Sequence, residues 1–152
     1  MQNNINQIKK YCNSLTQYLR YKTREVFIGD IPLGGNNPTR IQSMTTTDTM
    51  NTIATVEQTI RMVEAGCEYV RITAPSINEA KNLEAIKKEL KIRGYAVPLI
   101  ADIHFTPNAA EMAARIVEKV RVNLGNYVDK KKFYLIQYSD AYYQDELDRI
   151  RE

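Results

Sequence analysis

The stretch Pro98-Leu99-Ile100-Ala101-Asp102-Ile103-His104-Phe105 decides the predicted fold class. A short apolar run after a proline is typical of a buried strand. Asp102 and His104 are two residues apart, so in extended backbone their side chains point to the same side. Thr106-Pro107 follows and predicts a helix start, with the threonine hydroxyl as N-cap and proline at the first helical position. A strand that presents an acid and an imidazole just before a helix is the layout of an α/β active site. The same two side chains could instead merely satisfy backbone groups of a loop.

Composition and charge indicate an ordinary globular domain. Of the 152 residues, 43% are hydrophobic and 26% are charged, and the formal net charge is +3. That charge is too small to indicate nucleic-acid binding, which needs a concentrated basic face. No apolar run approaches the roughly 18 residues of a membrane span. Cys12 and Cys67 are too far apart for a CxxC ligand pair or a disulfide framework. Because residues 1–22 also lack a signal-peptide core, we expect a cytoplasmic protein with no nucleic-acid or membrane partner.

The beginning of the chain predicts an arm and a small hairpin. Residues 1–22 carry apolar side chains at helical spacing and predict either a short helix or a mobile arm. The alternation from Thr23 to Leu33, interrupted by Gly29-Asp30, predicts a β-hairpin. Residues 34–38 are expected to form a flexible connection. They resemble a phosphate-binding P-loop only in their glycines, and because the P-loop lysine and hydroxyl are missing, a phosphate site is not expected here.

Strands and helices alternate after this hairpin. Strands are predicted at 39–44, 67–73, 98–105 and 119–123. The helix after the first strand is expected to turn Ile53, Val56, Ile60 and Val63 toward the core. The next helix is expected to begin with a capping box of Ser76 and Glu79 and to end at Gly94. The third is expected to run through Ala109, Met112, Ala113 and Ile116.

This alternation, at intervals of about 20 to 30 residues, predicts an α/β fold with parallel strands. Four βα units are half of an eight-stranded TIM (β/α)8 barrel. We therefore predict the N-terminal half of a TIM barrel, preceded by the small β-hairpin, with residues 1–22 as an arm and 23–152 as a partial barrel that binds a substrate. The strands around Ile41 and Val122 should be the terminal ones, and the inward strand faces should be partly uncovered, which would favour association or poor solubility.

Polar side chains follow each predicted strand at its carboxyl end. Arg71 lies inside the second strand, and Arg121 lies in the fourth. Because arginine presents a planar fork suited to phosphate oxygens, two arginines at one edge predict a diphosphate ligand. The alternative for Arg71 is a structural ion pair, perhaps with Asp102. The polar run from Thr45 to Thr49 is expected to be a solvated loop and not a ligand-facing one.

Five short motifs together resemble a known enzyme family. They are Thr23-Arg24, Gln42-Ser43-Met44-Thr45, Val70-Arg71-Ile72-Thr73, Ala101-Asp102-Ile103-His104-Phe105 and Arg121-Val122-Asn123-Leu124-Gly125-Asn126. Their order and spacing resemble 4-hydroxy-3-methylbut-2-enyl diphosphate synthase, an iron–sulfur oxidoreductase of the non-mevalonate isoprenoid (terpenoid) pathway. The run from Asn126 to Phe133 resembles the three-domain branch of that family, which occurs in some bacteria and in plants.

The resemblance implies a substrate, a cofactor and partners. The barrel would bind 2-C-methyl-D-erythritol 2,4-cyclodiphosphate at its strand ends. A 4Fe-4S cluster, held by three cysteines and a glutamate on a separate C-terminal domain, would close over it. Two electrons from flavodoxin or ferredoxin would open the ring and give the allylic diphosphate. The full-length enzyme is expected to be a homodimer.

The resemblance also implies roles for seven residues, all in substrate binding and none as a metal ligand. Arg71 and Arg121 would grip the diphosphate, and Met44 would line the pocket. The residues expected to orient or contact the rest of the substrate are Asp102, His104, Asn123 and Asn126.

Two departures from the family pattern affect these expectations. Leu124 stands where the family usually has proline, so the turn at Gly125-Asn126 is less stiffly defined. The cluster cysteines are absent from these 152 residues, so we expect this part alone to bind substrate and to be inactive. The alternatives are another phosphate-binding barrel, such as a dihydropteroate-synthase-like enzyme, and a non-catalytic βα binding module. The motifs around Asp102 and Arg121 argue against the first.

Overall fold

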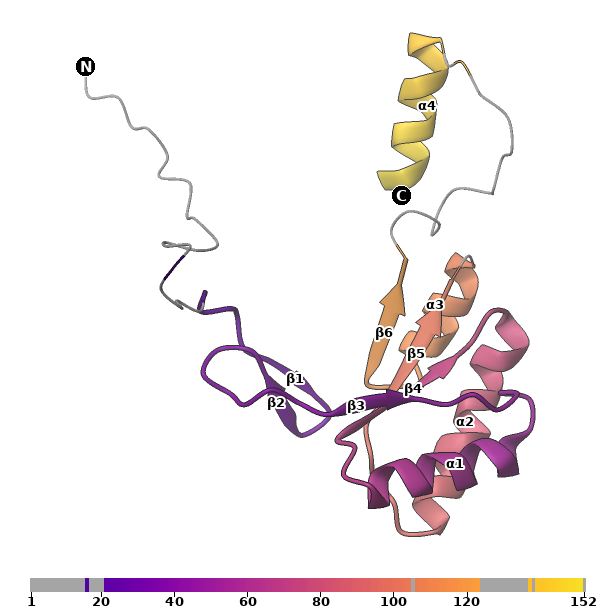
Figure 1. The fold of residues 1–152 in the computed structure, drawn as a ribbon. Coiled ribbons are helices and arrows are strands. Elements are labelled where there is room, and N and C mark those ends of the chain that lie inside the picture. The colour runs from indigo at the N-terminus through magenta and orange to yellow at the C-terminus, as the bar shows by residue number, and fades with distance from the viewer. Residues whose placement is uncertain (1–15, 17–20, 105, 124–136, 138, 152) are drawn as a thin grey trace. The chain divides into compact units, whose positions relative to one another are not determined.

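The computed structural model describes residues 16, 21–104, 106–123, 137 and 139–151 (Figure 1). The chain divides into two compact units, Met1–Thr39 and Arg40–Glu152, which are described separately. The predicted arm at 1–22 falls almost entirely outside the described residues, as do Leu124 and the Gly125-Asn126 turn.

The first unit contains the predicted β-hairpin. Its antiparallel strands are β1 (Val26–Ile28) and β2 (Ile31–Leu33). Gly29 between them has φ +59°, a left-handed conformation that glycine adopts without a steric penalty. The hairpin prediction is therefore confirmed.

The connection after the hairpin, which was expected to be flexible, contains a hydrogen-bonded turn. The Asn37 backbone N–H donates to the Gly34 carbonyl at 3.0 Å, and the Gly35 N–H donates to Thr23 Oγ1 at 3.1 Å. Gly34 has φ +87°, and a Cβ at this position would lie 2.3 Å from the Arg24 carbonyl oxygen. The glycine here permits a close backbone approach within a hydrogen-bonded turn.

The second unit contains a parallel sheet in the order β3-β4-β5-β6. The strands are β3 (Gln42–Met44), β4 (Tyr69–Thr73), β5 (Leu99–Ile103) and β6 (Lys119–Val122). Among the described residues, β3 and β6 are the outer strands and do not pair with each other. The predictions of four parallel strands and of two terminal ones are confirmed.

Helices join successive strands and cover one face of this sheet (Figure 1). They are α1 (Thr52–Glu64), α2 (Ile77–Ile92) and α3 (Pro107–Ala114). Helix α1 packs beside α2 and α2 beside α3, while α3 also contacts β5 and β6. A further helix, α4 (Asp140–Arg151), follows the undescribed segment 124–136. None of the helices in the described part of the chain has the length and apolarity that crossing a membrane requires.

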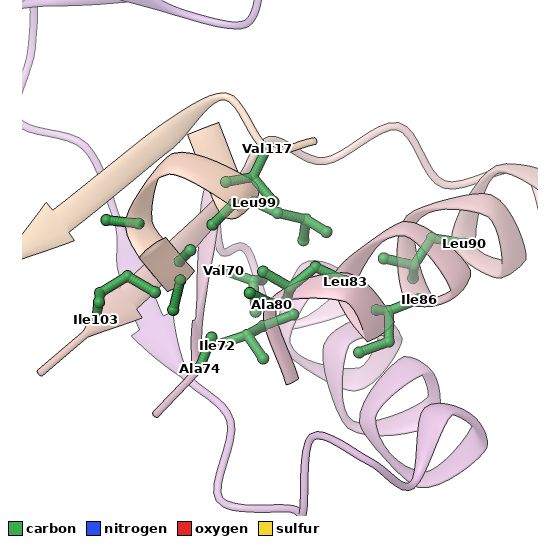
Figure 2. Packing of buried hydrophobic residues seen from close by; sticks show 14 of the residues in the cluster. Val70, Ile72, Ala74, Ala80, Leu83, Ile86, Leu90, Leu99, Ile103 and Val117 are labelled. Carbon is green, nitrogen blue, oxygen red and sulfur yellow. The ribbon is translucent and has the colours of Figure 1, made fainter. Parts of the chain in front are cut away.

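The helix-facing side of the sheet is the hydrophobic core (Figure 2). Alternate residues of β4 and β5 pack against the inner stripe of α2, and all are at most 2% exposed: Val70, Ile72, Leu99, Ala101, Ile103, Ala80, Leu83, Ile86 and Leu90. Burying a side chain of Val, Leu or Ile size contributes about 1.5–3 kcal/mol. This core therefore fixes which strand side chains point away from the helices.

Three of the four α1 residues predicted to face the core do so: Val56 is buried in it, and the half-buried Ile60 and Val63 pack against it. Ile53, expected to face the core, is 49% exposed, whereas Thr55 and Thr59 are fully buried beside Val56. The apolar spacing alone allowed this error, because the contacts that α1 makes with β4 and α2 set its rotation.

The helix starts follow the sequence in one case and depart from it in the other. Ser76 and Glu79 form the predicted capping box at α2, and the hydrogen bond from the Ser76 side chain lowers the pKa of Glu79. At α3, Pro107 occupies the first turn as predicted, but the Thr106 hydroxyl makes no cap bond. It donates instead to the Pro75 carbonyl oxygen, 3.3 Å away. This carbonyl belongs to a loop that is distant in the sequence, so the sequence around Thr106 does not reveal it as an acceptor. Helix α3 also ends at Ala114, before the predicted Ile116.

Glu68 fixes the beginning of the edge strand β3. Its carboxylate accepts the Ile41 backbone N–H at 2.8 Å and pairs with Arg40 Nη1 at 2.8 Å. The bond from Ile41, followed by that from Arg40, holds the pKa of Glu68 below its ordinary value. The carboxylate thus anchors a strand that has a sheet neighbour on one side only among the described residues.

Candidate functional site

The candidate residues lie on the face of the sheet that α1, α2 and α3 do not cover. Ile72, Ala101 and Ile103 belong to the helix-facing core, so alternation places Arg71 and Asp102 on the opposite face. Strand register then defines two rows of neighbours on this face. The rows are Met44–Arg71–Ile100–Lys119 and Thr73–Asp102–Arg121.

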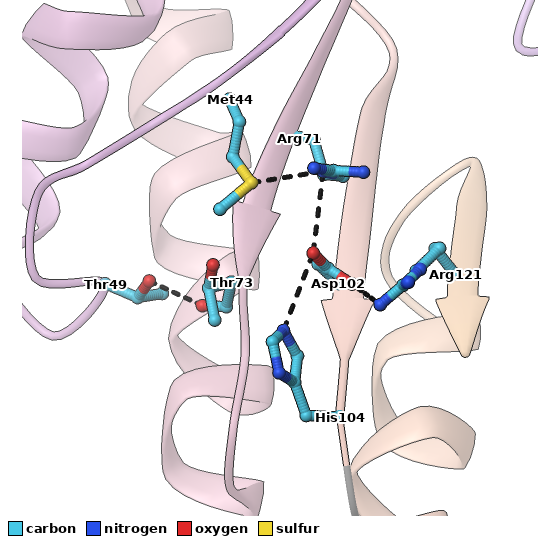
Figure 3. Close-up of polar contacts among 7 residues, drawn as sticks. All are labelled: Met44, Thr49, Arg71, Thr73, Asp102, His104 and Arg121. Carbon is cyan, nitrogen blue, oxygen red and sulfur yellow. Dashed lines mark hydrogen bonds and ion pairs between the residues drawn. The ribbon is translucent and has the colours of Figure 1, made fainter. Parts of the chain in front are cut away.

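Asp102 is the centre of the polar contacts on this face (Figure 3). Arg121 Nη1 donates to Asp102 Oδ1 at 3.0 Å, and Arg71 Nε lies 3.5 Å from Oδ2. His104 Nε2 lies 3.6 Å from the same Oδ2. The Asp102 side chain is only 4% exposed, and a carboxylate buried to that degree needs such compensation. The structural ion pair considered for Arg71 is therefore present.

The side chains that surround Asp102 are accessible to solvent, whereas its carboxylate is buried. The side chains of Arg71, Arg121 and His104 are 32%, 42% and 40% exposed. Asp102 contacts one nitrogen of each guanidinium, and a guanidinium has five N–H donors, so both arginines have donors to spare for a ligand. Two arginines and one aspartate sum to a formal charge of +1. The arrangement therefore attracts anions and presents two oriented forks to them.

Met44 and Asn123 flank this group. Met44 is the last residue of β3, and its Sδ accepts a contact from Arg71 Nε at 3.1 Å. Asn123 follows directly after β6 and is half-buried. Asn126 lies outside the described residues. The structure thus assembles Met44, Arg71, Asp102, His104 and Arg121, while the ligand that each contacts stays a prediction.

The segment Thr45–Asn51 is here called the threonine loop. Its run from Thr45 to Thr49 was expected to be solvated, which holds for the exposed Thr46 and Asp48 but is wrong for Thr45 and Thr49. Thr45 and Thr49 are 3% and 5% exposed. The Thr49 hydroxyl donates to the Thr73 carbonyl at 2.6 Å, and Asn82 Nδ2 on α2 donates to the Thr49 carbonyl at 2.7 Å. At Thr49, a backbone carbonyl and a side-chain amide from distant segments therefore replace water as hydrogen-bond partners.

Lys119 is a cationic residue that the sequence reasoning did not select. It is half-buried and shares a row with Arg71 and a strand face with Arg121. Lys119 lies two residues before Arg121 in the predicted strand, and this spacing indicates that both side chains point to the same face. The lysine adds a further positive charge to the uncovered face.

The described residues do not fit an iron–sulfur cluster. They contain no group of three or more His, Cys, Asp or Glu side chains that could hold a metal ion. Cys67 is a half-buried free thiol, whereas 4Fe-4S clusters are held mainly by several cysteine thiolates. No reaction step through a cluster is therefore assigned to these residues.

Comparison with known proteins agrees with the fold and with the motifs. The family described as "GcpE TIM-barrel domain" matches residues 23–143. The chain is 54% identical over 142 residues to a protein of Akkermansia muciniphila, covering 93% of this chain and 24% of that protein. It is 56% identical over 136 residues to a protein of Parabacteroides distasonis, covering 89% of this chain and 22% of that protein. A protein of Leptospira interrogans is 54% identical over 135 residues, which cover 89% of this chain and 20% of that protein.

All three relatives carry the name 4-hydroxy-3-methylbut-2-en-1-yl diphosphate synthase (flavodoxin). The chain spans between a fifth and a quarter of the length of these curated relatives. The resemblance drawn from the five motifs is thereby confirmed. The match over residues 23–143, together with the parallel βα units that those residues form, shows that the chain belongs to the GcpE TIM-barrel domain family.

Proposed function

We propose that this chain is the diphosphate-binding part of a 4-hydroxy-3-methylbut-2-enyl diphosphate synthase. In the complete protein, the substrate is 2-C-methyl-D-erythritol 2,4-cyclodiphosphate, which is opened reductively to the allylic diphosphate. The observation that carries the proposal is the pair of partly exposed arginines, Arg71 and Arg121, held on either side of the buried Asp102. The names of the relatives support the choice of substrate.

Binding follows from the chemistry of this pair. A guanidinium can donate two parallel hydrogen bonds to phosphate oxygens, and each charged hydrogen bond contributes about 1.5–3 kcal/mol. Asp102 fixes one nitrogen of each arginine, so less side-chain freedom is lost when the anion binds. In the proposal, His104 and Asn123 orient the remainder of the substrate, and Met44 lines its pocket.

Reduction requires two electrons, and the described residues include no group of three or more His, Cys, Asp or Glu side chains that could hold a metal ion. We infer that the 4Fe-4S cluster and its ligands belong to parts of the complete protein outside this chain. Flavodoxin is the proposed electron donor because the names of the relatives specify it, with ferredoxin as the alternative. The proposed setting is a homodimer in the cytoplasm.

The test is the substitution Arg71→Lys in the complete protein. Lysine keeps the positive charge but loses the fork, so one or two charged hydrogen bonds disappear and the Kd for the cyclic diphosphate should rise about 10- to 100-fold. Isothermal titration calorimetry measures the change. Arg61→Lys, at an exposed position of α1, is the matched control and should bind as the wild type does. Unchanged affinity in Arg71→Lys would contradict the proposed role of the arginine pair.

A further inference from the structure

Gln58, on α1, contacts the threonine loop at three points. Its Oε1 accepts the backbone N–H groups of Thr46 at 3.0 Å and of Thr47 at 3.1 Å. Its Nε2 donates to Thr46 Oγ1 at 3.0 Å. One half-buried amide side chain therefore binds two consecutive backbone donors just beyond the end of β3.

The rest of the loop is held by separate contacts. Thr55, which is fully buried on α1, hydrogen-bonds Thr47 Oγ1 at 2.9 Å and donates to the Asp48 carbonyl at 3.1 Å. Thr49 is bound to Thr73 and to Asn82, as described above. Loss of the Gln58 contacts would therefore release Thr46, while Thr47 stays bound to Thr55 and the other end of the loop stays attached.

The beginning of the loop is the part that touches the arginine site. Met44 directly precedes it, and Met44 Sδ contacts Arg71 Nε at 3.1 Å. The Thr45 backbone N–H donates to the Arg71 carbonyl at 2.9 Å. The Gln58 contacts at Thr46 and Thr47 thus lie directly after the two residues that contact Arg71, and they add to the bonds that hold Met44 beside its guanidinium.

We propose that Gln58 is a positioning residue for the anion site. By binding the N–H groups of Thr46 and Thr47, it keeps Met44 against Arg71, so that the guanidinium stays beside Asp102 in the geometry that receives phosphate oxygens. A binding group held in place by its supporting contacts loses less freedom when the ligand arrives. This inference rests on the proposed function for the identity of the substrate.

The test compares Gln58→Leu with Gln58→Glu in the complete protein. Leucine removes all three contacts, whereas glutamate keeps an acceptor for both backbone N–H groups. We expect Gln58→Leu to speed hydrogen exchange at the threonine loop and to raise the Kd for the cyclic diphosphate about tenfold, with turnover at saturating substrate within about twofold of wild type. Gln58→Glu should restore both exchange protection and affinity. Glu57→Leu, at an exposed neighbouring position, is the control and should resemble wild type.

Inorganic pyrophosphate, titrated as a second anion, separates this inference from the proposed function. If wild type binds pyrophosphate but not the cyclic diphosphate, the proposed function fails, and a loss of pyrophosphate affinity in Gln58→Leu still supports positioning. Faster loop exchange with unchanged affinity for both anions would overturn the inference. The inference would also be overturned if Gln58→Leu lowered both turnover and melting temperature and Gln58→Glu did not restore them. That result would show that Gln58 only stabilises the fold. Absence of binding of either anion to wild type would overturn both proposals.

Discussion

Replacing Asp102 with asparagine removes the negative charge that Arg71 and Arg121 share. Asparagine can still accept the bond from Arg121 Nη1 through its Oδ1, but it leaves the two guanidinium groups without a counter-charge. Removing one partner of a fully buried ion pair costs about 3–5 kcal/mol. Here the arginine side chains are 32% and 42% exposed, so water screens part of the effect.

The expected destabilisation is therefore smaller than that for a fully buried pair. We expect Asp102→Asn to lower the opening free energy of the β5 amides by about 1–2 kcal/mol, and Asp102→Ala, which also removes the acceptor, by about 2–3 kcal/mol. Native-state hydrogen exchange of the complete protein measures this local quantity without requiring all domains to unfold in one step. Glu111→Gln, at an exposed position of α3, is the charge-matched control and should have little effect.

A double-mutant cycle tests the contact itself. Asp102→Asn combined with Arg121→Gln should show a coupling energy of about 1 kcal/mol or more, because the two groups lie 3.0 Å apart. Additive effects within about 0.3 kcal/mol, or stabilisation by Asp102→Asn, would refute the reasoning that Asp102 holds the arginines.

Three further outcomes are expected. His104→Asn should lower turnover of the complete protein and leave its iron content unchanged, because the described residues place no metal-binding group around His104; iron lost in proportion to activity would contradict this role. Glu68 has a lowered pKa, so its stabilising contribution is present above about pH 4.5 and is lost as the pH falls through the lowered value. Glu68→Gln should consequently flatten the acid side of the β3 and β4 exchange-stability profile, and an unaltered profile would count against the contact with Ile41. Val56→Ala, at a fully buried position, should cost about 0.5–2 kcal/mol of opening free energy in α1, whereas Ile53→Ala, at a 49% exposed position, should cost less than about 0.5 kcal/mol. A cost at Ile53 as large as that at Val56 would instead support the expectation that Ile53 also faces the core.

The strands and the shared site face were predictable because they depend on local patterns. An apolar run with Arg71 in its middle, and another that ends in Asp102 and His104, each specify a strand and the side to which its polar residues point. Parallel βα units then bring those sides together at one edge. The pairing of Arg71 with Asp102 was accordingly one of the alternatives, and the structure contains it.

The errors concern residues whose partners are distant in the sequence. Gln58 lies 12 residues beyond Thr46, and Asn82 lies 33 residues beyond Thr49, so the order of the threonine loop has no local signature. The Thr106 hydroxyl similarly donates to the distant Pro75 carbonyl and does not cap the helix that it precedes. In each case a hydrogen bond to a residue distant in the sequence replaces the local interaction, with water or with the adjacent helix, that was expected.

The most direct test of the central claim is a crystal structure of the complete protein with 2-C-methyl-D-erythritol 2,4-cyclodiphosphate bound. Phosphate oxygens should lie within hydrogen-bond distance of both Arg71 and Arg121, with Asp102 still contacting the two guanidinium groups. A cyclic diphosphate bound elsewhere in the protein, with neither arginine in contact with a phosphate oxygen, would contradict it.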